Sequence, residues 1–596
     1  MTAPSNGPGR SCDWPAATDD RSDSRGLVVT NRTGGAASSA GPARRWIGLA
    51  LLTGLALGLR LYALDDRSLW GDEMNMVRFS TGERPMELAF GNAPLYVALL
   101  RAVSAMGTTD FAYRLPAALF GTAIVPVLFL FGRRVADWRV GAVASALAAI
   151  SPLLIEHSQS VHSYSAFCLL SLLGHHLFSR AWERDSKADW TCLVLTVGAG
   201  LYVHLYMVFV AANLVALSVV RGAWDGAAFG WGALRAAYRR RRRSLLTVAF
   251  AIGAIWSPWL VRWIGPLLWE LGKRSLGMET EVAYLAQEPR PRIQWNLWWR
   301  ALQELLTGDL RHTGLAVFGL LVAIVGAVAL WRRRPPAGVG MVLWICLPLA
   351  PTAVFTYLSR IDYGTRRLIF VLPELLLLVA VGLLALAGVV VARLAGASRA
   401  SRRGQELVAL ALAVGGAGAM SGPLLPAYYF ERENPDYRRL ASFLAGHVRP
   451  RDVVVAWKPE RLGYYYDGPH EIFDVESLTM EAVERLYQTS RRFWYVRPRA
   501  VRLRARKGYP ELEAWLEAEG IFRFPFGGGL DISFDRRADA ITPRALRERA
   551  RLLEGALQLK PDRWYLHQAL ARTYRGWQGK ESEARYHAEK AAQLRP

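Results

Sequence analysis

Two adjacent carboxylates lie in a loop just beyond the first apolar run of the chain. The loop contains the sequence Trp70-Gly71-Asp72-Glu73. A carboxylate can take a proton from a hydroxyl group, and two neighbouring carboxylates can help to hold a divalent metal ion. Solvated loop acids, or a charge pair at the N-terminus of a helix, are the simpler structural explanations. Because two like charges repel each other, one acid should titrate at an unusually high pH unless a cation lies nearby.

Basic and aromatic residues flank other apolar runs. Arg366 and Arg367 directly precede such a run. If the apolar run crosses a membrane, a guanidinium at its start lies at the level of the lipid headgroups and can bind a lipid phosphate through two hydrogen bonds. Arginines are also common there as anchors of helix ends. The sequence His157-Ser158-Gln159 is followed by His162-Ser163-Tyr164, and His204 lies between two short apolar stretches. For His204, a contact to a phosphate or sugar and a purely structural hydrogen bond are both open.

The composition places these side chains in a membrane protein. Of the 596 residues, 52% are hydrophobic and 22 are Trp, which excludes a wholly soluble or a disordered chain. Apolar runs long enough to cross a hydrocarbon core of about 30 Å recur between Trp46 and Leu425. We therefore expect a polytopic α-helical protein with about 11 transmembrane helices. The expected helices begin near Trp46, Phe111, Val140, Ser165, Trp190, Tyr206, Leu245, Gly314, Val339, Leu368 and Leu407.

The run from Trp190 to Val220 is long for one span and short for two. Arg184 precedes this run and Arg221 follows it, and both flanks have the basic character of cytoplasmic loops. An even number of crossings must therefore separate the two flanks. We expect two short spans, with His204 at the outer turn between them.

The formal net charge of +23, from 73 Lys and Arg against 50 Asp and Glu, could indicate a protein that binds nucleic acid. Several arginines, however, cluster in short loops at 133–134, 239–243 and 402–403. Basic loops mark the cytoplasmic side of a membrane protein and contact anionic lipid. We therefore expect membrane lipid, and no nucleic acid, as a partner. The N-terminus of this multi-pass protein of the cell membrane should be cytoplasmic and its C-terminal domain external.

Four segments differ in composition. Residues 1–43 are rich in small and polar residues, which predicts a disordered cytoplasmic tail. Residues 44–425 form the expected membrane domain, with an outer loop at 65–110. Residues 426–540 alternate short apolar stretches with amphipathic ones, which predicts an external α/β domain. Residues 541–596 have the spacing of a tetratricopeptide (TPR) repeat, which predicts a terminal helical hairpin. One such unit cannot bury its own face, so either the segment from Pro543 to Leu559 adds a helix to the stack or the unit packs on the α/β domain; binding of a protein partner is a further, weaker interpretation.

The order of the motifs resembles that of the GT-C class of polytopic glycosyltransferases. The group in question is related to protein mannosyltransferases and aminoarabinose transferases, which use polyprenyl-phosphate sugars. The shared motifs are Trp70 to Glu73, Pro94-Leu95-Tyr96, Arg114-Leu115-Pro116, Gln159 to Tyr164, His204, Trp256 to Trp259 and Arg366 before Pro373. The chain departs from the group at three places. It has Asn92-Ala93-Pro94 where members often carry His-Pro-Pro, His162 where they often carry Arg, and Arg367 where Tyr is more usual.

The resemblance implies an enzyme that moves a sugar from an undecaprenyl- or dolichyl-phosphate carrier to a lipid, glycan or protein on the outer side of the membrane. Asp72 would be the general base, and Glu73 would orient the acceptor or help Asp72 to hold a divalent metal ion. No other cofactor is expected. Contacts to the donor phosphate or its lipid chain are implied for Arg366, Arg367, His162, His204 and Tyr164. Contacts to the acceptor or the sugar are implied for Asn92, Tyr96 and Gln159.

Two other classes of protein fit some of these features. A transporter or flippase of lipid-linked sugars would also have many spans, but charged residues are scarce in the middle of the expected spans and no inverted repeat is evident. A non-catalytic scaffold would use the membrane part as an anchor and the tail to bind a partner. A scaffold should tolerate Asp72→Asn, whereas an enzyme should lose turnover.

Overall fold

The computed structural model describes residues 40–84, 93–224, 229–275, 296–349, 365–395, 402–431, 435–498, 522–534 and most of 547–594, apart from short gaps inside these ranges. The disordered tail expected at 1–43 lies almost entirely outside them. Residues 49–596 form a single compact unit, and helix α1 (Ala40–Leu61) leads into it.

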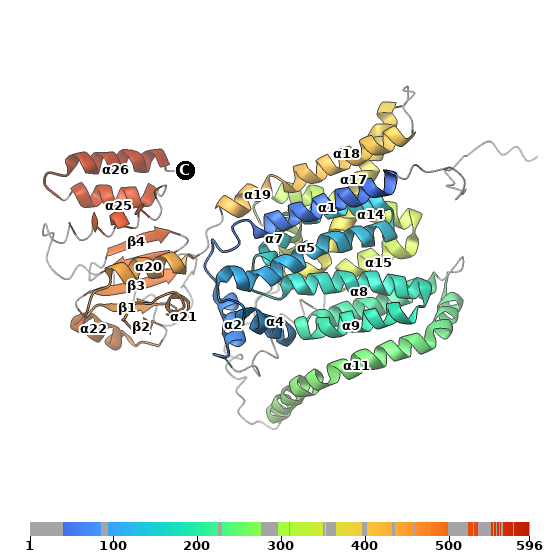
Figure 1. Ribbon diagram of the computed structural model, residues 1–596, viewed down its shortest axis with the longest axis horizontal. Coiled ribbons are helices and arrows are strands. Elements are labelled where there is room, and N and C mark those ends of the chain that lie inside the picture. Colours follow the sequence, from blue (N-terminus) through green and yellow to red (C-terminus); the bar gives the residue numbers. More distant parts are fainter. Residues whose placement is uncertain are drawn as a thin grey trace, which may run out of the picture. The chain divides into compact units, whose positions relative to one another are not determined.

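A helix covers at least part of every apolar run for which the sequence predicts a span (Figure 1). Four of the described helices are long and apolar enough to cross a membrane, or five if the bent pair α6 and α7 forms one span. The other expected spans do not meet this criterion of length and apolarity, so a total of about 11 crossings stays a prediction. Besides α1, the helices are α5 (Asp110–Val135), α6 (Trp138–Ile150), α8 (Tyr164–Arg184), α9 (Lys187–Val203), α10 (Met207–Ala223), α11 (Trp231–Ser275), α14 (Thr313–Arg333), α15 (Pro335–Cys346), α17 (Leu372–Ala395) and α18 (Arg402–Ser421).

The chain breaks between α9 and α10 where two short helices were expected. Helix α9 ends at Val203, His204 is extended with φ −159° and ψ 132°, and α10 begins at Met207. The backbone N–H of His204 still bonds to Gly200 O, while Met207 N–H bonds to His204 O. The turn therefore satisfies its own backbone groups and leaves the His204 ring free to face its neighbours.

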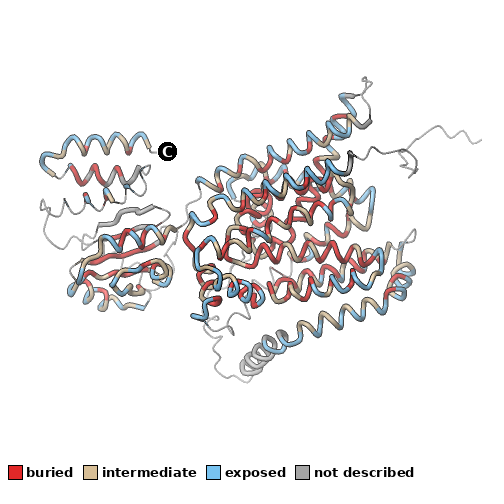
Figure 2. Tube along the Cα trace, viewed as in Figure 1, coloured by how far each residue is buried: buried red, intermediate tan, exposed pale blue. Residues whose placement is uncertain are grey.

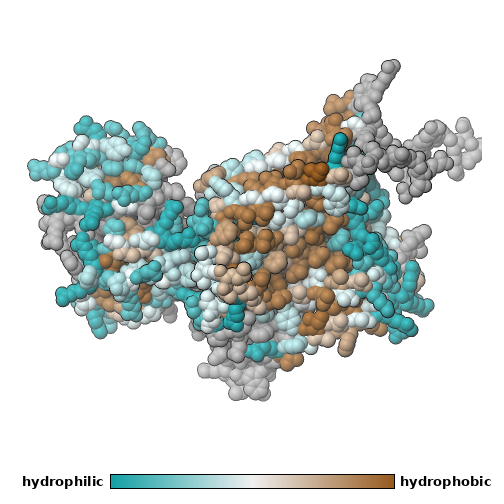
Figure 3. All heavy atoms as spheres, viewed as in Figure 1, coloured by the Kyte–Doolittle hydropathy of each residue, from teal (hydrophilic) through white to brown (hydrophobic). Residues whose placement is uncertain are grey.

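Apolar side chains both fill and cover the helical part of the protein. Figure 2 shows buried positions along the inner helices, and Figure 3 shows apolar atoms over the visible surface of the same helices. Large side chains on this outer surface are well exposed, for example Leu51 at 70%, Phe250 at 79% and Leu321 at 57%. A surface of this kind requires a lipid environment, because water would leave so much apolar area unfavourably hydrated.

Two glycines let α14 and α17 approach each other closely. A Cβ atom on Gly326 would lie 1.9 Å from the carbonyl oxygen of Leu378, and one on Gly382 would lie 2.0 Å from that of Val322. Small residues commonly permit such backbone contact between membrane helices, where packing rather than hydrophobic burial drives association.

Shorter elements at one end of these helices surround the candidate site. They are α2 (Gly71–Thr81), α4 (Pro94–Ser104), α7 (Pro152–Ser158), α13 (Asn296–Thr307) and the 3₁₀ helix η1 (Thr365–Val371). Helix α2 follows α1 through the loop 62–70, and η1 leads directly into α17. Residues far apart in the sequence therefore meet at the ends of the membrane helices.

A mixed five-stranded sheet forms the centre of the segment 426–540, for which an α/β domain was expected. Its order is β2-β1-β3-β5-β4, with β1 parallel to β2 and β3, and β5 antiparallel to β3 and β4. The strands are β1 (Val453–Ala456), β2 (Ile472–Asp474), β3 (Phe493–Pro498), β4 (Phe522–Gly527) and β5 (Leu530–Phe534). The connecting elements are α19 (Leu424–Pro426) and η2 (Ala427–Glu431) before the sheet, and α20 (Tyr437–His447), α21 (Pro459–Gly463) and α22 (Met480–Thr489) beside it.

The alternation of side chains in β1 explains why both faces of the sheet are covered. Val454 belongs to the core cluster that includes Leu440 of α20, whereas Val455 belongs to the cluster that includes Val483 of α22. Successive side chains of a strand point to opposite faces, so a strand that is apolar throughout needs a partner on each face.

Two helices close the chain. Helices α25 (Trp564–Arg575) and α26 (Glu581–Leu594) pack on each other, and Leu570, Tyr574 and Ala584, three residues of the TPR-like spacing, are buried. The hairpin has the form that the sequence pattern indicates. Its assignment as a TPR unit and its capacity to bind a protein stay predictions.

We predict that Gly326→Ala destabilises the protein. The new methyl group must displace the backbone of α17, which should lower the free energy of unfolding by about 1–3 kcal/mol despite the better helix propensity of Ala. Gly388→Ala is the matched control, because Gly388 lies on α17 with nothing within 4 Å of an added Cβ. Thermal unfolding in detergent measures both variants. Equal midpoints for the two would contradict the close approach of α14 and α17.

Candidate active site

Glu73 lies in a buried ion pair with Arg114, and both side chains are only 2% exposed. The Arg114 guanidinium donates from Nε to Glu73 Oε1 at 3.3 Å and from Nη2 to Oε2 at 3.0 Å. The backbone N–H of Val161 donates to Oε1 at 2.7 Å, and that of Trp70 donates to Oε2 at 3.1 Å. Each carboxylate oxygen thus accepts two hydrogen bonds, which offset the cost of burying its charge.

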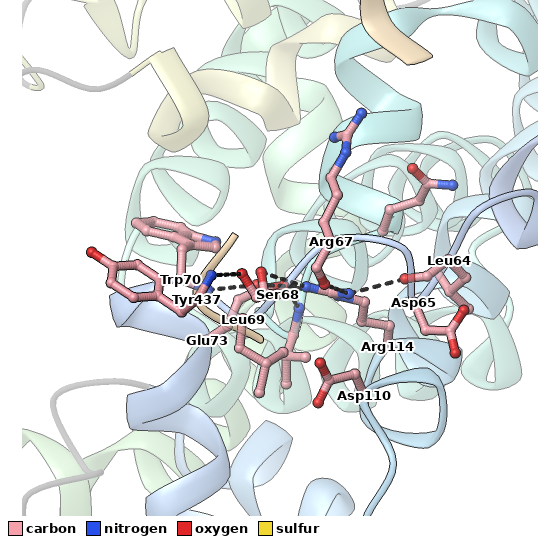
Figure 4. A network of polar contacts seen from close by, with 12 residues as sticks. Leu64, Asp65, Arg67, Ser68, Leu69, Trp70, Glu73, Asp110, Arg114 and Tyr437 are labelled. Carbon is pink, nitrogen blue, oxygen red and sulfur yellow. Dashed lines mark hydrogen bonds and ion pairs between the residues drawn. The ribbon is translucent and has the colours of Figure 1, made fainter. Parts of the chain in front are cut away.

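The remaining donors of Arg114 hold the loop that leads into α2 (Figure 4). Its Nη1 donates to the carbonyl oxygens of Leu64 at 3.0 Å and Arg67 at 2.7 Å, and Nη2 donates to that of Ser68 at 3.4 Å. Arg114 comes from the second turn of α5, and Glu73 occupies the third position of α2, from which its side chain reaches back to the N-terminus of the helix. The ion pair therefore joins α2, α5 and the loop into one rigid corner.

Asp72 has a different environment from its neighbour. Its Oδ2 accepts a hydrogen bond from Nη1 of Arg366 at 3.0 Å, and the side chains are 40% and 34% exposed, respectively. The Arg366 guanidinium also lies over the Trp70 ring, 5.3 Å from its centroid. Adjacent side chains on a helix point about 100° apart, so one acid can be buried while the next stays accessible. Each of the two acids has its own arginine, which removes the repulsion expected from the sequence.

Three predicted donor-site residues form one group of rings. His162 stacks on Tyr164 with centroids 4.0 Å apart, and Tyr164 is 5.6 Å from His204. His204 stacks on Phe167 at 4.5 Å. The Tyr164 hydroxyl also interacts electrostatically with the charged groups of Arg366, Asp72 and Arg367. The structure therefore brings most of the predicted donor-site residues together with Asp72.

Both histidines of this group are neutral near pH 7. Burial lowers the pKa of His162 well below its usual value, and electrostatic interactions with His204 and with the positive charge of Arg366 lower it further. Burial and the nearby charges of Arg367 and Arg366 lower the pKa of His204 to about 3. The Nδ1 atoms accept hydrogen bonds from the backbone N–H groups of Ser163 and Tyr206, at 3.0 and 3.2 Å, which places the ring proton on Nε2. These rings can thus donate one hydrogen bond each without carrying a charge.

The three residues that the resemblance assigns to acceptor or sugar contacts have different positions. Tyr96 is 1% exposed, interacts electrostatically with Glu73, and its hydroxyl has no hydrogen-bond partner among the described residues. The Gln159 amide donates to the carbonyls of Leu59, Arg60 and Tyr62 at the end of α1, and its oxygen accepts from Tyr428. Gln159 thus holds a helix end here. Asn92 lies outside the described residues.

The sequence analysis names Asp72 and Glu73 as possible ligands of a divalent metal ion. In the part of the chain that the structure describes, no three His, Cys, Asp or Glu side chains gather around a common point. Asp72 and Glu73 each pair with an arginine instead. A divalent ion at this site would have to replace the Asp72 to Arg366 pair, and its presence stays a prediction.

Several buried charges were not selected from the sequence. Arg60 of α1 is fully buried and donates to Ser158 Oγ at 3.2 Å and to three carbonyl oxygens. His175 of α8 contacts Glu374 of α17 at 3.2 Å. Their positions inside apolar runs could have indicated these residues, because an ionisable side chain in such a run is costly unless it has a partner. Arg114 lay in a recognised motif, but only the structure gives it a role.

Comparisons with known proteins agree with this architecture. Residues 91–226 match the family model described as dolichyl-phosphate-mannose-protein mannosyltransferase. Among solved structures, apo ArnT from Cupriavidus metallidurans is 15% identical, with a TM-score of 0.52 over 83% of this chain and 98% of that protein. ArnT bound to undecaprenyl phosphate has a TM-score of 0.49, with 15% identity over 83% of this chain and 99% of that protein.

A more distant likeness is to the apo oligosaccharyltransferase of Archaeoglobus fulgidus. It is 10% identical, with a TM-score of 0.47 over 78% of this chain and 70% of that protein. None of the curated proteins matches the chain. The similarity to apo ArnT shows a shared fold over 83% of this chain.

We predict that Glu73→Gln strongly destabilises the protein. The change leaves the buried Arg114 charge without its counter-ion, which should cost about 3–5 kcal/mol. Glu83→Gln is the control, because Glu83 pairs with Arg78 at 3.5 Å and is 59% exposed. An exposed pair of this kind contributes less than about 1 kcal/mol. Thermal unfolding of the two variants should differ clearly, and an unchanged midpoint for Glu73→Gln would contradict a structural role for the pair.

We also predict a histidine contribution to acid sensitivity. In the unfolded chain His204 has its usual pKa near 6.5, whereas in the folded protein the pKa is about 3. Between these values the unfolded state binds the extra proton, so stability falls as the pH falls below about 6.5. The His204→Gln variant should lose less thermal stability than the wild type between pH 7 and pH 5. Identical losses would show that His204 does not titrate as the geometry requires.

Proposed function

We propose that this chain is a membrane glycosyltransferase of the GT-C class, and that it moves a sugar from a polyprenyl-phosphate carrier to an acceptor hydroxyl. The family match over residues 91–226 and the fold shared with ArnT support this proposal. The pair formed by Asp72 and Arg366 carries the proposal. It sets an accessible carboxylate beside a guanidinium, at the end of the apolar helices where a lipid headgroup would lie.

The reaction needs a base and a stabiliser of negative charge, and this pair supplies one of each. Asp72 takes the proton from the acceptor hydroxyl as its oxygen bonds to the anomeric carbon of the sugar. The bond between that carbon and the phosphate oxygen breaks, and both of its electrons leave with the phosphate. The guanidinium of Arg366 stabilises the charge on the departing phosphate through two parallel hydrogen bonds. Asp72 must release Arg366 when the donor binds, which frees the carboxylate to act as the base.

The neutral histidines suit the same donor. His162 and His204 can each donate one hydrogen bond from Nε2 to a phosphate oxygen, and Arg367 adds charge close to His204. The name of the matched family includes a dolichyl-phosphate sugar, which supports a polyprenyl-phosphate donor for this chain. The exposed apolar helix surfaces fit a long isoprenoid tail that stays in the bilayer.

The charge pattern supports an active site on the outer side of the membrane. Arg133 and Arg134 lie at the end of α5 opposite to Arg114, which holds the candidate site. If basic loops are cytoplasmic, the reaction takes place on the outer face of the cell membrane. The acceptor is then a lipid, a glycan or a protein outside the cytoplasm.

We predict that Asp72→Asn abolishes most of the transfer while the protein keeps its fold. Removal of a general base should lower turnover about 100-fold or more, because the amide cannot take the proton. The assay offers a panel of radiolabelled polyprenyl-phosphate sugars and a membrane extract as the source of acceptor. Asp66→Asn is the control, because Asp66 is an exposed acid of the same loop.

Transfer by the wild type and by Asp66→Asn, but not by Asp72→Asn, would support both the activity and the base. Full activity of Asp72→Asn would exclude this residue as the base. If the purified wild type binds a donor but transfers no label when acceptors are in excess, the proposal of a transferase is wrong.

A further inference from the structure

We infer that the C-terminal α/β domain is a working part of the active site, and that its Tyr465 is the positioning residue that fixes the loop before Asp72. The inference rests on the proposed function, because it assigns this domain a task in the same reaction. Tyr465 follows α21, 393 positions after Asp72 in the chain. It nevertheless reaches the loop that leads into α2.

The Tyr465 hydroxyl joins two elements of the membrane part. It accepts a hydrogen bond from the backbone N–H of Leu69 at 2.7 Å and donates one to Oδ2 of Asp110 at 2.8 Å. Leu69 is fully buried and lies three residues before Asp72, and Asp110 is the first residue of α5. One hydroxyl therefore ties the start of α5 to the loop that precedes the proposed base.

Other groups of the domain hold the same loop. The Ser68 hydroxyl donates to Pro435 O at 2.7 Å and accepts from the backbone N–H of Tyr437 at 3.0 Å. Arg438 donates to Asp65 O at 3.0 Å, forms an ion pair with Asp110 and covers the Tyr465 ring. The loop from Asp65 to Leu69 is thus bound along its length by the domain.

The membrane part holds the same loop through other atoms. Arg114 binds the carbonyl oxygens of Leu64, Arg67 and Ser68, while the domain binds Ser68 Oγ and Leu69 N–H. The loop therefore lies between two sets of hydrogen bonds. The domain also fills the space beside the helix start, because a Cβ on Gly71 would lie 2.7 Å from Nη2 of Arg461.

This double support matters because Asp72 has little support of its own. Its side chain is 40% exposed and forms an ion pair with Arg366. The same arginine is proposed to bind the donor phosphate, so this ion pair is lost when the donor binds. Once a donor occupies Arg366, the direction of the carboxylate depends on where α2 begins. That point depends on the loop which Tyr465 holds. A displacement of the base by about 1 Å can lower turnover by about 100-fold.

Tyr465→Phe tests the inference, because it removes the bridging hydroxyl and keeps the ring that Arg438 covers. Tyr464→Phe is the matched control, since this half-buried neighbour loses the same group at the same edge of the domain. In the sugar-transfer assay we expect Tyr465→Phe to lower kcat about tenfold, with the donor KM unchanged and the thermal midpoint near that of the wild type. Tyr464→Phe should retain the wild-type kcat.

Hydrogen exchange of the intact protein, followed by mass spectrometry, gives a second measurement that needs no activity. Peptides covering residues 65–73 should exchange faster in Tyr465→Phe than in the wild type or in Tyr464→Phe. Equal exchange in all three proteins would overturn the inference, as would an equal kcat in an active preparation. A wild type that transfers no sugar would contradict the proposed function alone, since the exchange result would still decide whether Tyr465 positions the loop.

Discussion

The buried pair of Glu73 and Arg114 is the interaction on which the arrangement of the site depends. Two charges in a dry environment are costly unless they neutralise each other and satisfy their remaining hydrogen-bonding groups. Here the carboxylate accepts four hydrogen bonds, and the guanidinium binds three backbone carbonyls as well. Because neither group can move without leaving the buried charge of the other unpaired, the start of α2 is held in one position. The side chain of the preceding residue, Asp72, then points toward Arg366.

The result is a division of labour between two adjacent acids. Glu73 gives rigidity, and Asp72 stays accessible with an arginine that a phosphate can also bind. The rings around Tyr164 add hydrogen-bond donors without adding charge, because His162 and His204 are neutral. A site with accessible guanidinium groups and uncharged donors suits a phosphate at the headgroup level better than an ion pathway, which would place its charges along the spans.

The sequence predicts the helices well and the site in part, for physical reasons. The hydropathy of a short stretch is enough to predict a membrane helix there. The basic residues on both flanks of 190–220 require an even number of crossings, which predicts the break at His204. Asp72 and Arg366 are 294 positions apart, so their contact depends on packing that no local pattern records. The pattern also cannot tell which of two adjacent acids is buried. A motif also gives a residue but not its direction, so the hydrogen bonds from the Gln159 amide to the end of α1 could not be predicted, and its contact to the sugar stays a prediction.

A cryo-electron microscopy structure of the wild type with undecaprenyl phosphate would show whether Arg366 receives the phosphate of the donor. We expect the phosphate to bind the guanidinium of Arg366 and to release Asp72 from this arginine, while the Glu73 to Arg114 pair stays closed. A phosphate bound elsewhere, with the Asp72 to Arg366 pair intact, would contradict this expectation.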